Sequence, residues 1–308
     1  MIYDITLRLS YAYARQATGG RHLVRLLPPD LPNQRLIAGK LTIHPQPDQR
    51  FDSTDFFANP LTEFAFANPY RTLTLKMHAR VDRSLPHQPL PGPVAANPTR
   101  AETLLADLPA ALAALTTLHP TSPLHFTAPS PRAPSDAAMA QYAHALLAPG
   151  MTTRNAILAI GAALHRDMVY DPDATNVDTP AAEAFALRHG VCQDFSHIMI
   201  ICLRSVGIPA GYVSGFLRTT PPPGKPRLEG ADAMHAWVRA WCGPHAGWLD
   251  YDPTNAVIAA GDHIDLAHGR DYFDVAPIKG ILRISGQQRS QQSVDVVPLQ
   301  PGDPPPGS

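Results

Sequence analysis

The sequence predicts an α+β fold in which a small antiparallel β domain precedes helices packed on an antiparallel sheet. Residues 2–13 alternate, with Ile5, Leu7 and Leu9 on one side and polar residues on the other, as in a half-buried strand. Ala/Leu-rich helical segments follow, and alternating strands return after residue 208. This order, in which the helices can pack on one side of an antiparallel sheet, is typical of an α+β fold.

The N-terminal part is expected to form a small sandwich or barrel-like antiparallel sheet. Asn-Pro pairs at 59–60 and 68–69 separate its later strands. It contains no combination of nucleophile and base, so we expect it to pack on the core and shape one side of a cleft. Its expected strands cover residues 2–13, 22–27, 34–44, 61–66 and 72–81.

The spacing of apolar residues predicts the helices and strands of the second part. Residues 195–206 carry apolar side chains at three- and four-residue intervals, and Gly207-Ile208-Pro209 ends that helix. Further helices are expected over 99–118, 134–147, 152–168 and 179–188, and strands over 209–218, 233–242, 247–251, 279–286 and 291–297.

The length of 308 residues exceeds the usual size of a single domain, so we expect two. A β-rich domain covers 1–85, a Pro-rich linker 86–98 and a catalytic domain 99–297. A Pro-rich tail, 298–308, is expected to be disordered. The Pro-rich segment 219–230 is expected to be a loop that borders the cleft.

Cys192 is the strongest candidate for a nucleophile. It follows Gly190-Val191 at the expected start of an apolar helix. The free amides and the dipole of a helix N-terminus favour a thiolate, and the same amides can receive an oxyanion. Cys202 and Cys242 fall on an apolar helix stripe and at the end of an apolar strand, so they are expected to be buried.

A base and an orienting acid follow Cys192 in the order that thiol catalysis requires. His235 lies near the start of one strand, and Asp252 lies at the end of the next, so that a hairpin would bring the two side chains together. Asp250 competes for the third position, because side chains at 250 and 252 point to the same face of a strand. Asp194 is interpreted as a first-turn acid that complements the helix dipole, and His197 is expected to point away from the thiol.

At these motifs the chain resembles the transglutaminase-like superfamily of papain-type thiol enzymes. Within it, the resemblance is to a bacterial branch described as cysteine proteases with a β-rich N-terminal region. The residues that carry it are Gly190-Val191-Cys192-Gln193-Asp194-Phe195, His235-Ala236-Trp237, Asp252-Pro253-Thr254-Asn255 and His268-Gly269-Arg270-Asp271-Tyr272. The resemblance spans about residues 150–300 and, more weakly, 1–85.

The resemblance implies a papain-like transglutaminase core in which Cys192 is the nucleophile, His235 the base and Asp252, in preference to Asp250, the orienting acid. It implies a peptide or protein amide as substrate and no cofactor. Hydrolysis is favoured over acyl transfer to an amine. A non-catalytic peptide-binding or scaffold protein of the same fold is the alternative outside enzymes.

Composition limits the remaining classes. With 25 Lys and Arg against 26 Asp and Glu there is no basic stripe, so nucleic acid is not an expected partner. No apolar run reaches membrane-spanning length, and the N-terminus lacks the basic leader and the apolar core expected of a signal peptide. The 14 histidines are scattered, so we expect no metal site. Three cysteines without a disulfide framework suit a reducing cytoplasm.

Overall fold

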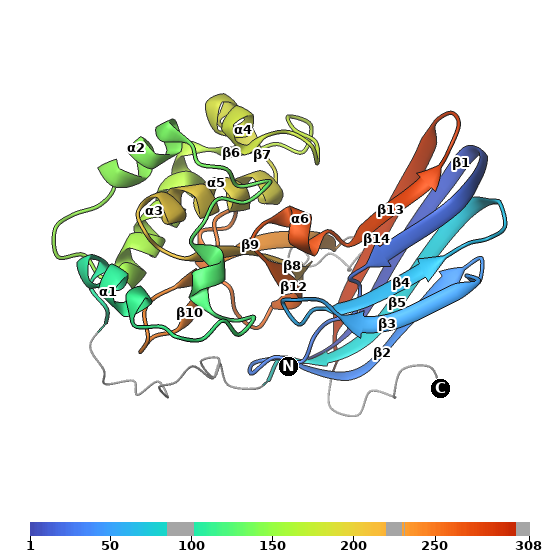
Figure 1. The fold of residues 1–308 in the computed structure, drawn as a ribbon, viewed down its shortest axis with the longest axis horizontal. Helices are drawn as coiled ribbons and strands as arrows, with labels where there is room; N and C mark the ends of the chain where they lie inside the picture. Colours follow the sequence, from blue (N-terminus) through green and yellow to red (C-terminus); the bar gives the residue numbers. More distant parts are fainter. Residues whose placement is uncertain (85–101, 220–229, 231, 300–308) are drawn as a thin grey trace, which may run out of the picture.

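The structure is a computed structural model, and it describes residues 1–84, 102–219, 230 and 232–299. The expected linker at 86–98, nearly all of the expected loop at 219–230 and the tail after residue 299 lie outside the described residues. The described elements form two parts, a β-sheet region and a mixed region of helices and strands, which lie side by side (Figure 1).

The N-terminal sheet is organised around one long strand, β1. The sequence predicts two strands, 2–13 and 22–27, but the structure joins them into β1 (Ile2–Val24), with irregular register between Ala12 and Ala17. Its first half pairs with β5 and its second half with β4, both antiparallel. The other strands of this part are β2 (Arg35–His44), β3 (Gln49–Thr54), β4 (Pro60–Ala65) and β5 (Tyr70–Asp82).

The last two strands belong to the N-terminal sheet and not, as the sequence reading placed them, to the catalytic part. β13 (Ile278–Arg283) and β14 (Gln288–Pro298) both pair antiparallel with β1. β5 and β4 pair with one side of β1, so its other side is available for β14 and β13. Val294 and Val296 are buried in the apolar cluster of this sheet. The order of elements along the sequence does not reveal that the last two strands pair with the first strand.

The second sheet has five antiparallel strands in the order β11-β10-β9-β8-β12. Three of them, β8, β9 and β10, agree with expected strands, whereas β11 and β12 were not predicted. The sequence of β12, His-Ile-Asp-Leu-Ala-His-Gly, mixes apolar and titratable residues, yet all seven are buried. The strands are β8 (Ala210–Leu217), β9 (Ala233–Trp241), β10 (Trp248–Asp252), β11 (Val257–Ile258) and β12 (His263–Gly269).

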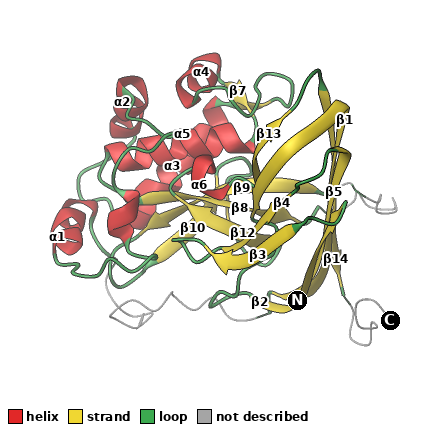
Figure 2. Ribbon diagram, turned by 45° about the vertical axis from the view of Figure 1, so that its right-hand side comes forward, coloured by secondary structure: helices red, strands yellow, loops and turns green. Residues whose placement is uncertain are grey.

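Helices cover one face of this second sheet (Figure 2). Of the expected helix at 99–118, the described residues form a shorter α-helix that starts only at Leu108, where Pro109, which lacks an N–H, fits the first turn. The helical elements are η1 (Leu105–Asp107), α1 (Leu108–Ala113), η2 (Pro123–Phe126), α2 (Ala137–Ala145), α3 (Thr153–Asp167), α4 (Ala181–Leu187), α5 (Cys192–Ser205) and α6 (Tyr272–Val275).

The helices are packed closely on the strands. At Gly161 of α3 an added Cβ would lie 2.1 Å from the ring of Tyr251, so a larger residue there would push α3 away from β10. None of the helices in the described parts of the chain is long and apolar enough to cross a membrane.

The two parts meet along β12, which is an edge strand of the second sheet. The side-chain amide of Gln34 donates to the backbone carbonyl of Asp265 and accepts from its N–H, both at 2.9 Å. Asn59 makes the same pair of hydrogen bonds with the backbone of His268, at 2.8 and 2.7 Å. An unpaired strand edge is costly when buried, and these two amides take the place of a neighbouring strand.

Candidate active site

Cys192 is the first residue of α5. A two-residue parallel pairing of β6 (Val169–Tyr170) with β7 (His189–Gly190) fixes the segment before it. The expected direct turn between two helices therefore contains a short strand. Arg188 adopts the left-handed conformation, with φ of 58°, where α4 ends. As the first two residues inside the helix, Cys192 and Gln193 have backbone amides without an acceptor in the helix, and these amides can donate to a ligand.

The start of α5 is held by Asp194, as its interpretation as a first-turn acid predicts. Its Oδ2 accepts from the N–H of Val191 at 2.8 Å and from the hydroxyl of Thr175 at 2.6 Å. A Cβ at Gly190 would come within 2.6 Å of the same oxygen, so glycine is needed for this close approach. Burial raises the pKa of Asp194. Its role here is to position the turn that carries Cys192.

His235 and Asp252 are brought together by the β9–β10 hairpin. Nε2 of His235 lies 2.7 Å from Oδ2 of Asp252, whose side chain is fully buried. Asn255 donates from Nδ2 to the same oxygen at 2.7 Å. The other oxygen, Oδ1, accepts from the backbone N–H groups of Thr254 at 2.9 Å and Asn255 at 3.2 Å. The tight turn after Pro253 therefore fixes both oxygens of the carboxylate.

The electrostatics of this group favour a charged pair. Burial by itself would lower the pKa of His235, but hydrogen bonds with Asp252 and with Cys192, and the charges of both partners, raise it to about 10. The pKa of Asp252 is well below its usual range: burial opposes this, and hydrogen bonds from His235 and His263 outweigh burial. Because Nε2 of His235 faces Asp252, Nδ1 is the ring nitrogen left for the thiol. The arrangement can therefore hold an imidazolium between a carboxylate and a sulfur atom.

Asp250, the competing candidate, has a different partner. Its carboxylate binds the guanidinium of Arg239 at 2.9 and 3.2 Å, and both residues are buried. Arg239 also contacts Nδ1 of His268 at 2.9 Å. Asp250 thus belongs to a buried ion pair behind the site, and the structure does not bring it to His235.

The other candidates lie away from the thiol chemistry. His197 is 2 % exposed and its Nε2 accepts from the backbone N–H of Tyr272 at 3.2 Å. Burial lowers its pKa to about 4, so it is neutral near pH 7. Burial also raises the pKa of Cys202 and of Cys242 to about 12. Of the three free cysteines, Cys192 is the one that is not buried.

Two residues of the site carry no predicted role. Asn255 belongs to the Asp252-Pro253-Thr254-Asn255 motif, but the motif assigns it no function, and no sequence pattern points to His263. His263 lies on the unpredicted strand β12, and its Nε2 is 3.1 Å from Oδ2 of Asp252. His235, Asp252 and His263 therefore place one potential metal-ligating atom each within 4.8 Å of one another, a convergence that the sequence reading did not find. Hydrogen bonds account for it, because both imidazoles contact the same carboxylate oxygen.

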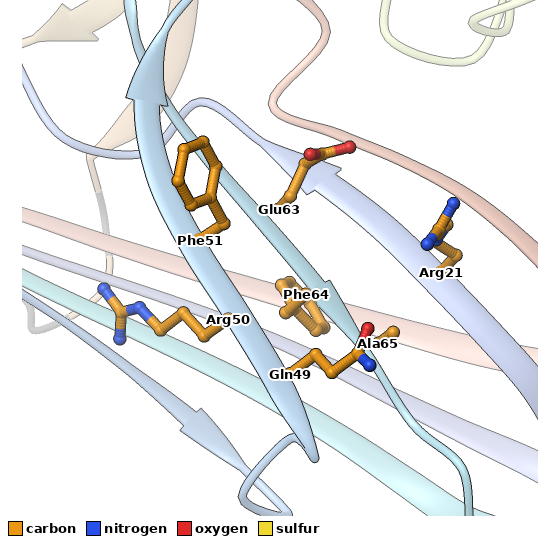
Figure 3. A pocket seen from close by; sticks show the side chains of 7 residues that line it. All are labelled: Arg21, Gln49, Arg50, Phe51, Glu63, Phe64 and Ala65. Carbon is orange, nitrogen blue, oxygen red and sulfur yellow. The ribbon is translucent and has the colours of Figure 1, made fainter.

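A pocket of about 490 Å³ adjoins this group, where the two parts of the chain meet. Asn255 and His263 line it on one side, and Tyr3 and Arg83 of the N-terminal part line it on another. Exposed Val257 and Ile258 of β11 form an apolar wall. A second pocket lies on β3 and β4, between Arg21, Phe51 and Glu63 (Figure 3), and it contains no nucleophile.

Two family models match the chain. Residues 3–82 match the bacterial transglutaminase-like N-terminal region, and residues 140–253 match the transglutaminase-like superfamily core. The first model covers the N-terminal sheet through β5, and the second covers the segments that carry Cys192, His235 and Asp252. The N-terminal model stops before β13 and β14, so the C-terminal strands of that sheet lie outside both matches.

Relatives and solved structures agree with these matches. An uncharacterized protein of Mycobacterium tuberculosis is 36% identical over 304 residues, which are 97% of this chain and 93% of the relative. An uncharacterized protein of Mycobacterium leprae is 43% identical over 47% of this chain and 49% of its own length. The crystal structure of "a Putative Cysteine Protease from Cytophaga hutchinsonii" superposes with a TM-score of 0.74 at 19% identity, covering 99% of this chain and 93% of that one.

Proposed function

Because this chain belongs to the transglutaminase-like superfamily, we propose that it is a thiol enzyme that acts on an amide or peptide bond through Cys192, His235 and Asp252. The observation that carries the proposal is the 2.7 Å contact between Nε2 of His235 and Oδ2 of Asp252. Cys192, the free thiol that is not buried, is close enough to the same imidazole to raise its pKa. This supports a set of nucleophile, base and orienting group.

The reaction follows from these positions. His235 takes the proton of the Cys192 thiol, and the sulfur attacks the carbonyl carbon of the substrate. The tetrahedral oxyanion is received by the backbone N–H of Cys192, at the positive end of α5. When the C–N bond breaks, His235 returns its proton to the departing amine and a thioester remains. Water, deprotonated by His235, then attacks the thioester and releases the carboxylic acid and the thiol.

Asp252 contributes orientation and charge. It fixes the ring so that Nδ1 faces Cys192, and its negative charge stabilises the imidazolium that forms in the first step. The five hydrogen bonds on its two oxygens keep the carboxylate from rotating.

We favour hydrolysis over acyl transfer to an amine, because the structural relative from Cytophaga hutchinsonii carries the name of a protease. The two reactions share the thioester and differ only in the acceptor that attacks it. A peptide or protein amide is the proposed substrate, and the pocket beside Asn255 and His263 is proposed to receive one of its side chains. The three free cysteines also fit a reducing cytoplasm, which we propose as the location.

Covalent labelling and product analysis test the proposal. Iodoacetamide near pH 7 should modify Cys192 faster than an ordinary thiol, and Cys192→Ala should abolish labelling and turnover while its melting temperature stays close to that of the wild type. Cys202→Ala is the matched control and should behave as wild type. Incubation with a peptide library, with and without an added primary amine, separates free acid from amide adduct by mass.

A scaffold protein of the same fold predicts a different result. Its Cys192 would react no faster than a free thiol, and no acyl product would form with or without the amine. That outcome would reject the enzymatic proposal as a whole.

A further inference from the structure

His263 contacts the candidate triad from outside its hairpin. It is the first residue of β12, and its side chain is 7 % exposed. Its ring is nearly perpendicular to that of Trp237, at 83° with centroids 5.0 Å apart, and this packing fixes the ring plane. β12 is separated from β10 by β8 and β9 in the sheet, so this contact joins Asp252 to a strand that is not its neighbour.

The position of the ring hydrogen in a neutral His263 follows from its two contacts. The backbone N–H of Ala260 points at Nδ1 at 3.4 Å, so Nδ1 is the acceptor nitrogen. In a neutral imidazole the hydrogen is then on Nε2, which lies 3.1 Å from Oδ2 of Asp252. His263 is therefore a hydrogen-bond donor to the same oxygen that accepts from His235.

The donors on Asp252 have different origins. Asn255, with its side chain and backbone, and Thr254 belong to the turn directly after Asp252, and they move with it. His235 is the group that Asp252 is proposed to orient. His263 is the donor to the carboxylate that comes from a strand outside the β9–β10 hairpin. Without it, the side chain of Asp252 keeps donors only from its own turn and from His235, the group that it is proposed to orient.

We propose that His263 is a positioning residue of the proposed thiol enzyme, which holds the carboxylate of Asp252 in the orientation that directs His235 toward Cys192. The assignment rests on the function proposed above. The titratable and charged groups around His263 are His235 on β9, Asp252 at the end of β10 and, across the adjoining pocket, Arg83, Arg218 and Asp262.

The N-terminal part also holds β12, the strand that carries His263. Gln34 and Asn59 hold the backbone of β12 at Asp265 and at His268, two and five residues beyond His263. The position of His263 therefore depends on a strand edge that the N-terminal part completes. This gives the N-terminal part a role in the geometry of the site although it supplies no reacting group.

The test compares variants that keep or remove the donor. His263→Phe retains a ring without an N–H toward Asp252, His263→Met is a second donor-free variant should the first fail to fold, and His263→Gln retains an N–H donor. Leu266→Ala is the matched control, because Leu266 is buried in β12 and its loss removes packing without touching Asp252. Melting temperature, kcat, KM and the rate of Cys192 alkylation across pH are measured for each.

We expect His263→Phe to lower kcat by about tenfold, the order found when a group that orients an active-site ligand is removed, with KM within about twofold. The onset of Cys192 alkylation should move to higher pH, because a displaced Asp252 no longer supports the imidazolium and the thiolate loses part of its counter-charge. His263→Gln should recover kcat to within about threefold of the wild type. Leu266→Ala should lower the melting temperature and leave kcat and the pH profile unchanged.

The assignment is overturned if the donor-free variants keep the wild-type kcat and pH profile, or if Leu266→Ala changes them equally. Failure of the proposed function looks different. In that case wild-type Cys192 itself shows no fast alkylation and no turnover, and the assignment of His263 fails with it.

Discussion

Asp250 and Asp252 lie two residues apart on β10, and their amide variants should damage different properties. In Asp250→Asn the buried guanidinium of Arg239 loses its carboxylate partner, which binds it at 2.9 and 3.2 Å. Removing one partner of a buried ion pair costs about 3–5 kcal/mol. Attraction to Asp265 partly compensates Arg239, which favours the lower end of that range. At about 2–4 °C per kcal/mol, the melting temperature should fall by about 6–12 °C.

Asp252→Asn should instead damage the rate. The carboxylate accepts from three side chains on Oδ2 and from two backbone N–H groups on Oδ1. An amide has one acceptor oxygen, so its NH2 must face donors on one side. If the NH2 faces His235, the imidazole turns its acceptor nitrogen toward residue 252 and its N–H toward Cys192, which is the wrong tautomer for a base.

The expected loss in kcat/KM is about tenfold to a thousandfold, or about 1.4–4 kcal/mol of transition-state stabilisation. It should be smaller than the loss in Cys192→Ala or in a His235 variant, because a thiol is already partly ionised near neutral pH. The alkaline limit of activity should also move to lower pH, since His235 loses a contact that raises its pKa.

The assay measures kcat/KM and Cys192 alkylation between pH 5 and about 10, at a temperature where both variants are folded, together with thermal unfolding. The reasoning is refuted if folded Asp250→Asn loses reactivity while Asp252→Asn reacts like the wild type. The two assignments would then have to be exchanged.

Three further outcomes are expected. Asn59→Leu should cost about 2–4 kcal/mol in the free energy of unfolding, measured by urea titration, because a buried N–H and C=O of β12 lose their partner; a loss below 0.5 kcal/mol would contradict this on the same scale. The pKa of His235 is raised from 6.5 to about 10, so its stabilising contribution is complete below about pH 6.5 and is lost as the pH rises through 10. The melting-temperature advantage of the wild type over His235→Gln should therefore shrink between pH 7 and 10, and a constant difference would argue against the charged pair. Ile258→Asp, in the apolar wall of the adjoining pocket, should raise KM about tenfold for apolar peptides with kcat unchanged, and an unchanged KM would place the substrate elsewhere.

The sequence by itself determined the family and most elements of the core. The α+β class and the membership in the transglutaminase-like superfamily are confirmed. The helix of Cys192 and the hairpin of His235 and Asp252 form where apolar spacing predicts them, because short-range periodicity and turn residues decide local structure. The roles of the three side chains stay predictions, although the contacts among them agree with those roles.

Only the tertiary structure decided what depends on distant segments. The alternation of side chains could not distinguish Asp250 from Asp252, since both face the same side of β10. Only the position of Arg239 on the neighbouring strand shows that the carboxylate of Asp250 is bound in an ion pair. The strand β12 escaped prediction because its buried titratable side chains have partners far along the chain, such as Arg83, which pairs with the carboxylate of Asp265 and which no local pattern reveals. For the same reason β13 and β14 could not be assigned to the first sheet, and His263 could not be placed behind Asp252. Local sequence specifies backbone conformation, whereas the pairing of buried polar groups is set by contacts between segments that meet only in the folded chain.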